Sequence, residues 1–228
     1  MKLTALVFEL VFGIEIGELM LRKTFLLSIL FLGLSQNFLF GQTNQLPVYE
    51  NETAYEVYSA VLSYPEAAQQ SKSKNFVIRQ ETLRKFGAFL DVEPAPNKIC
   101  LRPDAESAKI IGTAVADFIK VNQTKWLLQE KFKLEIPYKL VSSETIISII
   151  NPFTEKEDWK EFYKQYPDSG GFIDLSAVGF NADKSVAVVS KGGWCGSLCG
   201  EGEYHVLQKK DGKWIPLEWK GEFCNWVS

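Results

Sequence analysis

The hydrophobic period of the chain changes at Gly171, and this change constrains the fold more than any other feature of the sequence. Before it, apolar residues recur at helical spacing in segments 53–64, 105–121 and 154–166. After it, short turns separate four segments in which apolar and polar residues alternate, GFIDLSAVGF, SVAVVS, EYHVLQKK and KWIPLEWK. The sequence therefore predicts an α+β fold in which N-terminal helices pack on a C-terminal antiparallel four-stranded β-meander.

Local signals refine this arrangement. A capping box of Thr53 and Glu56 predicts the start of the first helix, and Asp104 is the expected cap of the second. The segment NFVIRQ at 75–80 predicts one short strand between these helices. No internal repeat and no long linker divides the helical half from the sheet half, so one core is expected.

The turn at 211–212 predicts the register of the last two strands. Its sequence is Asp-Gly, which favours a two-residue hairpin because both positions need positive φ. Pairing Lys210 with Lys213 then places His205 across from Glu218 on one face of the sheet. The sequence holds no other histidine than His205, so this position matters for any acid–base chemistry.

The N-terminal region predicts export. A basic pair follows Met20, an apolar run extends over Phe25–Leu34, and the small residue Gly41 completes the order of a secretory signal. Since a membrane span needs about 20 apolar residues, this shorter run favours cleavage over anchoring. We expect residues 1–41 to be an upstream extension plus a signal peptide, with the true start at Met20, and residues 42–228 to form a single α+β domain.

The charge balance excludes some partners. The formal net charge is -3, and no cluster of Lys and Arg stands out. Nucleic acids and anionic lipids are bound by such clusters, so neither is an expected partner. The sequence predicts an extracytoplasmic product, periplasmic or secreted, without a stable membrane span after signal cleavage.

The cysteines predict disulfides. The chain has four, Cys100, Cys195, Cys199 and Cys224, and an even number in an exported protein favours a disulfide framework. Of the possible pairings we favour Cys195 with Cys199 and Cys100 with Cys224. The chain-entropy model assigns about 2 kcal/mol to the short loop and about 5 kcal/mol to the long one.

The C-terminal half also carries a family resemblance. The segments GFN, CGSLCGEG and GKW, within residues 179–214, resemble a group of uncharacterised secreted bacterial proteins with the pattern GFN…CGxLCGxG…GKW. The resemblance extends more loosely to FYKQYP and AYEVYSAVL upstream. Because that group has no assigned activity, the resemblance implies export and a shared domain but transfers no catalytic residue.

The glycine-rich segment Gly192–Gly202 is the candidate functional site. A disulfide-clamped hairpin loop is the structural interpretation, and a thiol at Cys195 or Cys199 activated by His205 is the functional alternative. The spacing CxxxC between strands differs from the CxxC of redox motifs, which favours the structural interpretation. Zinc held by these residues and Cys224 matches no common spacing. We therefore expect no metal and no cofactor.

The aromatic residue in this segment suggests binding. Trp194, together with Gly196, Ser197 and Leu198, forms a possible binding loop for a protein or glycan partner, although tryptophan is more often packed in a core. The leading hypothesis is an exported non-enzymatic envelope or secreted domain that binds a ligand or protein. The alternative is a thiol-dependent enzyme or redox protein that uses Cys195 or Cys199 with His205.

Overall fold

The computed structural model describes most of the C-terminal four-fifths of the chain. The described segments are 45–64, 73–84, 101–150, 159–223 and 226–227. The helices are α2 (Glu52–Ser63), α3 (Ser107–Val121), α4 (Ser143–Ile149) and α5 (Trp159–Gln165). The strands are β1 (Asn75–Arg79), β2 (Leu101–Pro103), β3 (Tyr138–Val141), β4 (Ser169–Leu175), β5 (Gly179–Phe180), β6 (Val186–Gly196), β7 (Cys199–Lys210), β8 (Lys213–Pro216), β9 (Gly221–Phe223) and β10 (Trp226–Val227). All of these elements belong to one compact unit, Leu46–Ser228.

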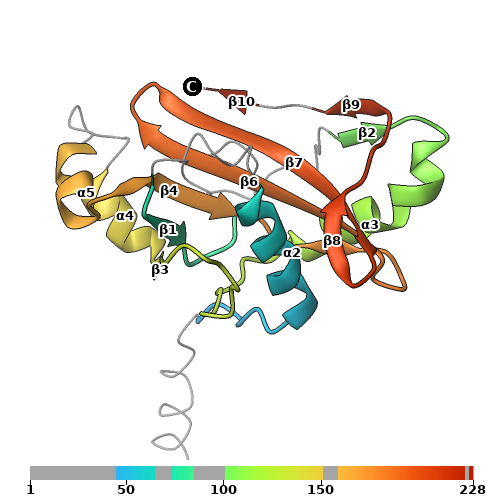
Figure 1. The fold of residues 1–228 in the computed structure, drawn as a ribbon, viewed down its shortest axis with the longest axis horizontal. Helices are drawn as coiled ribbons and strands as arrows, with labels where there is room; N and C mark the ends of the chain where they lie inside the picture. The colour runs from blue at the N-terminus through green and yellow to red at the C-terminus, as the bar shows by residue number, and fades with distance from the viewer. Residues whose placement is uncertain (1–44, 65–72, 85–100, 151–158, 224–225, 228) are drawn as a thin grey trace, which may run out of the picture. The chain divides into compact units, whose positions relative to one another are not determined.

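The central feature is a mixed β-sheet (Figure 1). Within the described residues it has eight strands, in the order β10-β7-β6-β4-β1-β3, with β5 paired to β6 and β8 paired to β7. The strands β2 and β9 form a separate two-stranded sheet. The expected fold, N-terminal helices on a C-terminal four-stranded meander, is therefore wrong. The part of the chain that was expected to be helical supplies β1 and β3 to the same sheet as the strands that follow it.

The parallel strands explain the error. Consecutive antiparallel pairing joins β4, β6, β7 and β8, but β1 pairs in parallel with both β4 and β3. Parallel partners lie far apart in the sequence and have no turn signal between them, so local patterns do not reveal the pairing. The strand β3 has only four residues, a length too short for alternation to distinguish it from a loop.

Both faces of the sheet are covered by helices. On one face, α2 packs over a core that includes Ile78, Ile173 and Val189. On the other face, α3 packs over Val188, whereas α4 and α5 pack at the opposite end of the sheet over Phe172 (Figure 1). Continuous apolar runs such as VAVV in β6 are typical of strands buried on both faces.

The predicted helix positions are largely confirmed, but the predicted caps are not. The helix α2 begins one residue before Thr53, after Asn51, and no side chain caps its first turn. Thr53 therefore lies inside the helix and forms no capping box. The carboxylate of Asp104 accepts a hydrogen bond from the backbone N–H of Ser107, at 2.8 Å, but the residue that directly precedes α3 is Glu106, two positions after the predicted cap.

The predicted final hairpin is also confirmed. Asp211 and Gly212 have φ values of 51° and 76°, as a two-residue turn of this type requires. Lys210 and Lys213 are Cα partners across the turn. The expected position of His205 across from Glu218 is not reached, because the paired residues of β8 end at Pro216.

Candidate functional site

The candidate site lies at the far end of the long β6–β7 hairpin. The two strands remain paired as far as Gly196 and Cys199, so most of the segment expected to be a loop is extended sheet. Only Ser197 and Leu198 turn the chain between the strands. We call residues 195–199 the hairpin tip. Glycine is rare in strands, which is why the sequence pattern indicated a loop here.

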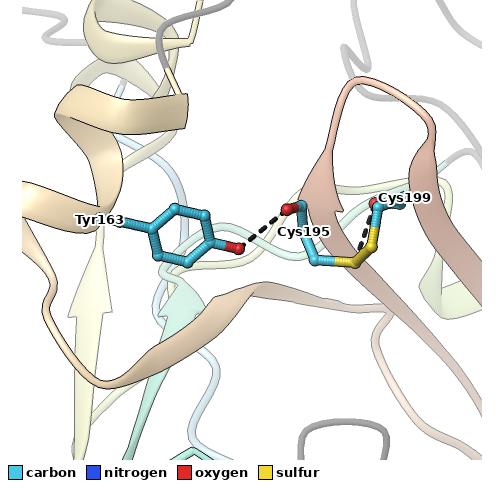
Figure 2. Close-up of a disulfide and its surroundings, with 3 residues drawn as sticks. All are labelled: Tyr163, Cys195 and Cys199. Atoms are coloured by element: carbon cyan, nitrogen blue, oxygen red, sulfur yellow. Dashed lines mark hydrogen bonds between the residues drawn. A yellow bond between two sulfur atoms is a disulfide. The ribbon is translucent and has the colours of Figure 1, made fainter.

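A disulfide closes the hairpin tip. Cys195 and Cys199 are bonded, with their Cα atoms 5.0 Å apart, and Figure 2 shows the bridge between the ends of the two strands. This confirms the predicted short pairing. The predicted bridge between Cys100 and Cys224 lies outside the described residues and stays a prediction.

Two contacts hold the Cys195 side of the tip against the rest of the domain. The hydroxyl of Tyr163, on α5, donates a hydrogen bond of 2.8 Å to the carbonyl oxygen of Cys195 (Figure 2). Gly171, on β4, has a φ of 100°, and a Cβ at this position would collide with the carbonyl oxygen of Trp194. The absence of a side chain at Gly171 thus allows β4 to approach the end of β6 closely.

Trp194 is part of this support. Its indole Nε1–H donates a hydrogen bond of 2.7 Å to Asp174 Oδ2, and its ring stacks on Phe172 with centroids 6.4 Å apart. The other oxygen of Asp174 lies 2.7 Å from Nε of Arg79. Trp194 is thus half-buried, and both its N–H and its ring contact residues of β4. This position agrees with the expectation that the tryptophan is packed against the domain.

The ion pair of Arg79 and Asp174 is a feature that the sequence pattern did not reveal. Both residues are buried, with 1% and 3% of their surfaces exposed. Burial raises the pKa of the Asp174 carboxyl, and the charge of Arg79 and the bond from Trp194 partly oppose this effect. A single charged residue within each of the apolar segments NFVIR and GFIDL was the available signal, since a buried charge requires a partner.

The tip exposes one large apolar side chain. Leu198 has 89% of its surface exposed and lies next to exposed Ser197. Val227, on β10, is 82% exposed, and its Cα partner is Glu201 on β7. These two are the most exposed large hydrophobic residues in the described part of the chain, and both belong to the same end of the hairpin.

His205 is distant from the tip. It lies on β7, six residues after Cys199, which corresponds to about 20 Å along an extended strand. Its Cα partner is Val189, whose side chain belongs to the core beneath α2. The structure therefore does not bring His205 together with Cys195 and Cys199. Its acidic neighbour is Glu203 on its own strand, with Oε1 3.3 Å from Nε2, and not the expected Glu218.

Buried charge near His205 affects its titration. Lys191 is buried across from Glu203 in the β6–β7 ladder. Burial lowers the pKa of Lys191, while Glu203 and Glu201 act in the opposite direction. Burial, and next the charge of Lys191, lowers the pKa of His205 to about 3. A neutral ring at ordinary pH follows, although the nearby Glu203 carboxylate by itself would favour the protonated form.

Acidification is expected to destabilise the domain through His205. An unfolded chain binds the histidine proton at a pKa of about 6.5, well above the folded value. The stability contributed by the neutral ring is therefore complete above about pH 6.5 and is lost as the pH falls toward the folded pKa. With 19% of the side chain exposed, we expect a loss of roughly 2 kcal/mol between about pH 7 and about pH 4.5.

Urea unfolding of the native chain and of His205→Asn at these two pH values measures this contribution. The variant lacks the titrating ring, so its free energy of unfolding should fall by roughly 2 kcal/mol less on acidification. Equal losses in both proteins would show that His205 is not the group responsible.

Among the described residues, no group of three or more His, Cys, Asp and Glu side chains could hold a metal ion. In the same segments, no helix is long and apolar enough to cross a membrane. Comparisons with known proteins return no family model, no curated protein and no solved structure that matches the chain.

Proposed function

We propose that this chain is an exported, non-enzymatic domain that binds a protein partner through the hairpin tip. The observation that carries the proposal is the 89% exposure of Leu198 on a turn closed by a disulfide and supported by Tyr163. Burial of such an exposed aliphatic side chain against a partner would be favourable. A turn constrained in this way also loses little conformational entropy when it binds.

The chemistry of the tip favours a protein over a glycan. Aromatic rings are the usual platforms for sugars, yet the ring of Trp194 is stacked on Phe172 and its N–H is bonded to Asp174. The exposed groups, Leu198 and Val227, are aliphatic and suit an apolar groove on a protein.

Export rests on two observations of different kind. The segment after Met20 has the order of a secretory signal. The Cys195–Cys199 disulfide favours an oxidising compartment, periplasmic or extracellular, because cytoplasmic reductants keep thiols free. The alternative, a thiol-dependent enzyme or redox protein using these cysteines with His205, has less support. Its nucleophile is in a disulfide, and its base is about 20 Å away along β7.

Site-specific photo-crosslinking in cells that produce the chain tests the binding proposal. A photoreactive side chain at position 198 is expected to form a discrete adduct with one protein. Position 110 on α3 is the matched control, because Ile110 is also exposed, at 53%, but belongs to a helix that packs over Val188, at the end of the β6–β7 hairpin opposite the tip. Leu198→Ser should reduce partner retention by about tenfold, the loss expected for one buried anchor residue, and leave the melting temperature unchanged. No adduct at position 198, or the same adducts at both positions, would refute the proposal.

A further inference from the structure

The two sulfur atoms of the hairpin-tip disulfide have different surroundings. Cys199 is exposed, as are Ser197 and Leu198 before it, whereas Cys195 is half-buried. The carbonyl group of Cys195 is bonded to Tyr163, and the preceding residue, Trp194, is bonded to Asp174. The bridge thus joins the end of β6, which is hydrogen-bonded to the rest of the domain, to the start of β7, which is exposed to solvent.

We propose that Cys199 is a site of thiol–disulfide exchange, at which an external dithiol attacks and opens the bridge while the sheet remains folded. The partner class is a dithiol reductant, either a small molecule or a protein with two neighbouring cysteines. This property goes beyond the binding of a partner through Leu198 and does not require it.

The reaction balances with the dithiol as the only co-reactant. One of its thiols loses a proton to water, and the thiolate attacks Sγ of Cys199 to form a mixed disulfide. The bond between the two cysteine sulfurs breaks, and the Cys195 thiolate leaves and takes a proton from water. The second thiol of the reagent then loses a proton to water, its thiolate attacks the reagent sulfur that is bonded to Cys199, and the Cys199 thiolate leaves and takes a proton from water. Two electrons have moved from the dithiol, which ends as a disulfide, to the protein, which ends with two thiols.

Geometry favours attack at Cys199 over attack at Cys195. Exchange requires the incoming thiolate to reach a sulfur from the side opposite the leaving sulfur, so access to each sulfur decides the rate. Cys199 begins β7 directly after the exposed turn and is itself exposed. Cys195 is half-buried, and Tyr163 of α5 holds its backbone carbonyl oxygen.

The sheet should survive the loss of this bridge. The bond closes a loop of only three intervening residues, so its loss adds little conformational entropy to the unfolded chain. Pairing of β6 with β7 continues from Trp194 and Gly200 down to Val186 and Gln208. The support from Asp174 and Phe172 also acts on Trp194 and not on the sulfurs. Opening is therefore confined to the hairpin tip.

Trapping with reduced glutathione tests which sulfur is attacked. The folded wild-type protein is mixed with excess glutathione, free thiols are blocked with N-ethylmaleimide after short times, and peptides are mapped by mass. Species with glutathione on Cys199 and maleimide on Cys195 should exceed the reverse by about tenfold. Equal amounts, or an excess of the reverse species, would overturn the proposal.

A second measurement tests whether the fold persists. Dithiothreitol is added under native conditions, and alkylation of Cys195 and Cys199 is followed together with the near-ultraviolet circular dichroism of the aromatic core. We expect complete alkylation of this pair while the signal is retained. If the bridge opened only as that signal was lost, the exchange would require unfolding and the proposal would fail.

The two single serine variants provide an independent comparison. Each is exposed to oxidised glutathione, and the rate of glutathione addition is measured. Cys199 in the variant Cys195→Ser should react about tenfold faster than Cys195 in the variant Cys199→Ser.

Discussion

Replacing Asp174 by alanine is expected to lower the free energy of unfolding by about 3–5 kcal/mol. The carboxylate lies 2.7 Å from Nε of Arg79, and both side chains are almost completely buried. Removing it deprives a buried guanidinium of this counter-charge, and the cost of burying that charge is then no longer offset. The substitution also removes the acceptor for Nε1 of Trp194, so the hairpin tip should become more mobile.

Urea unfolding monitored by circular dichroism measures the effect. The matched control is the double variant Arg79→Met with Asp174→Leu, which removes both charges while keeping apolar volume. Such replacements of buried ion pairs are often neutral or stabilising, so the double variant should be clearly more stable than Asp174→Ala. A single variant within about 1 kcal/mol of the native chain, as for a surface pair, would show that this ion pair is not buried in solution.

Removal of the predicted Cys100–Cys224 bridge is expected to destabilise the domain more than removal of Cys195–Cys199. The chain-entropy model assigns about 5 kcal/mol to the long loop and about 2 kcal/mol to the short one. For a domain of this length, these values correspond to decreases in melting temperature of about 10–20 °C and about 4–8 °C. The residues next to the first pair, Leu101 and Phe223, are Cα partners in the β2–β9 ladder, which favours this pairing.

Two double serine variants allow the comparison without leaving an odd thiol. One combines Cys100→Ser with Cys224→Ser, and the other combines Cys195→Ser with Cys199→Ser. Thermal unfolding of both, under the same non-reducing conditions, gives the two melting temperatures. Equal decreases would contradict the predicted pairing, as would a larger decrease for the short loop.

Elements with strong local signals were predictable from the sequence. The Asp-Gly turn at 211–212 identified the last hairpin and its register, because few residues other than glycine adopt the required φ. The apolar spacing of α2 and α3 identified both helices. In each case the residues that determine the structure are neighbours in the chain, so the pattern contains the information.

The remainder depended on contacts between distant segments. The pairing of β1 with β4 joins Val77 to Phe172, and nothing near either residue indicates the other. The support of the hairpin tip has the same character, since Tyr163, Gly171 and Asp174 approach it from other elements. The disulfide at the tip was predictable because its cysteines are close in the chain, whereas the separation of His205 from it required the extended course of β7.

The parallel pairing of β1 with β4 has a consequence for how the domain forms during synthesis. Val77 leaves the ribosome about 95 residues before Phe172, and at about 5–20 residues per second this interval lasts roughly 5–20 s. The strand β3 emerges within this interval and can pair with one edge of β1, but the edge that pairs with β4 has no partner until Phe172 has been made. An unpaired strand edge is a site at which nascent copies can associate, and a factor that covers this edge during synthesis would suppress such association.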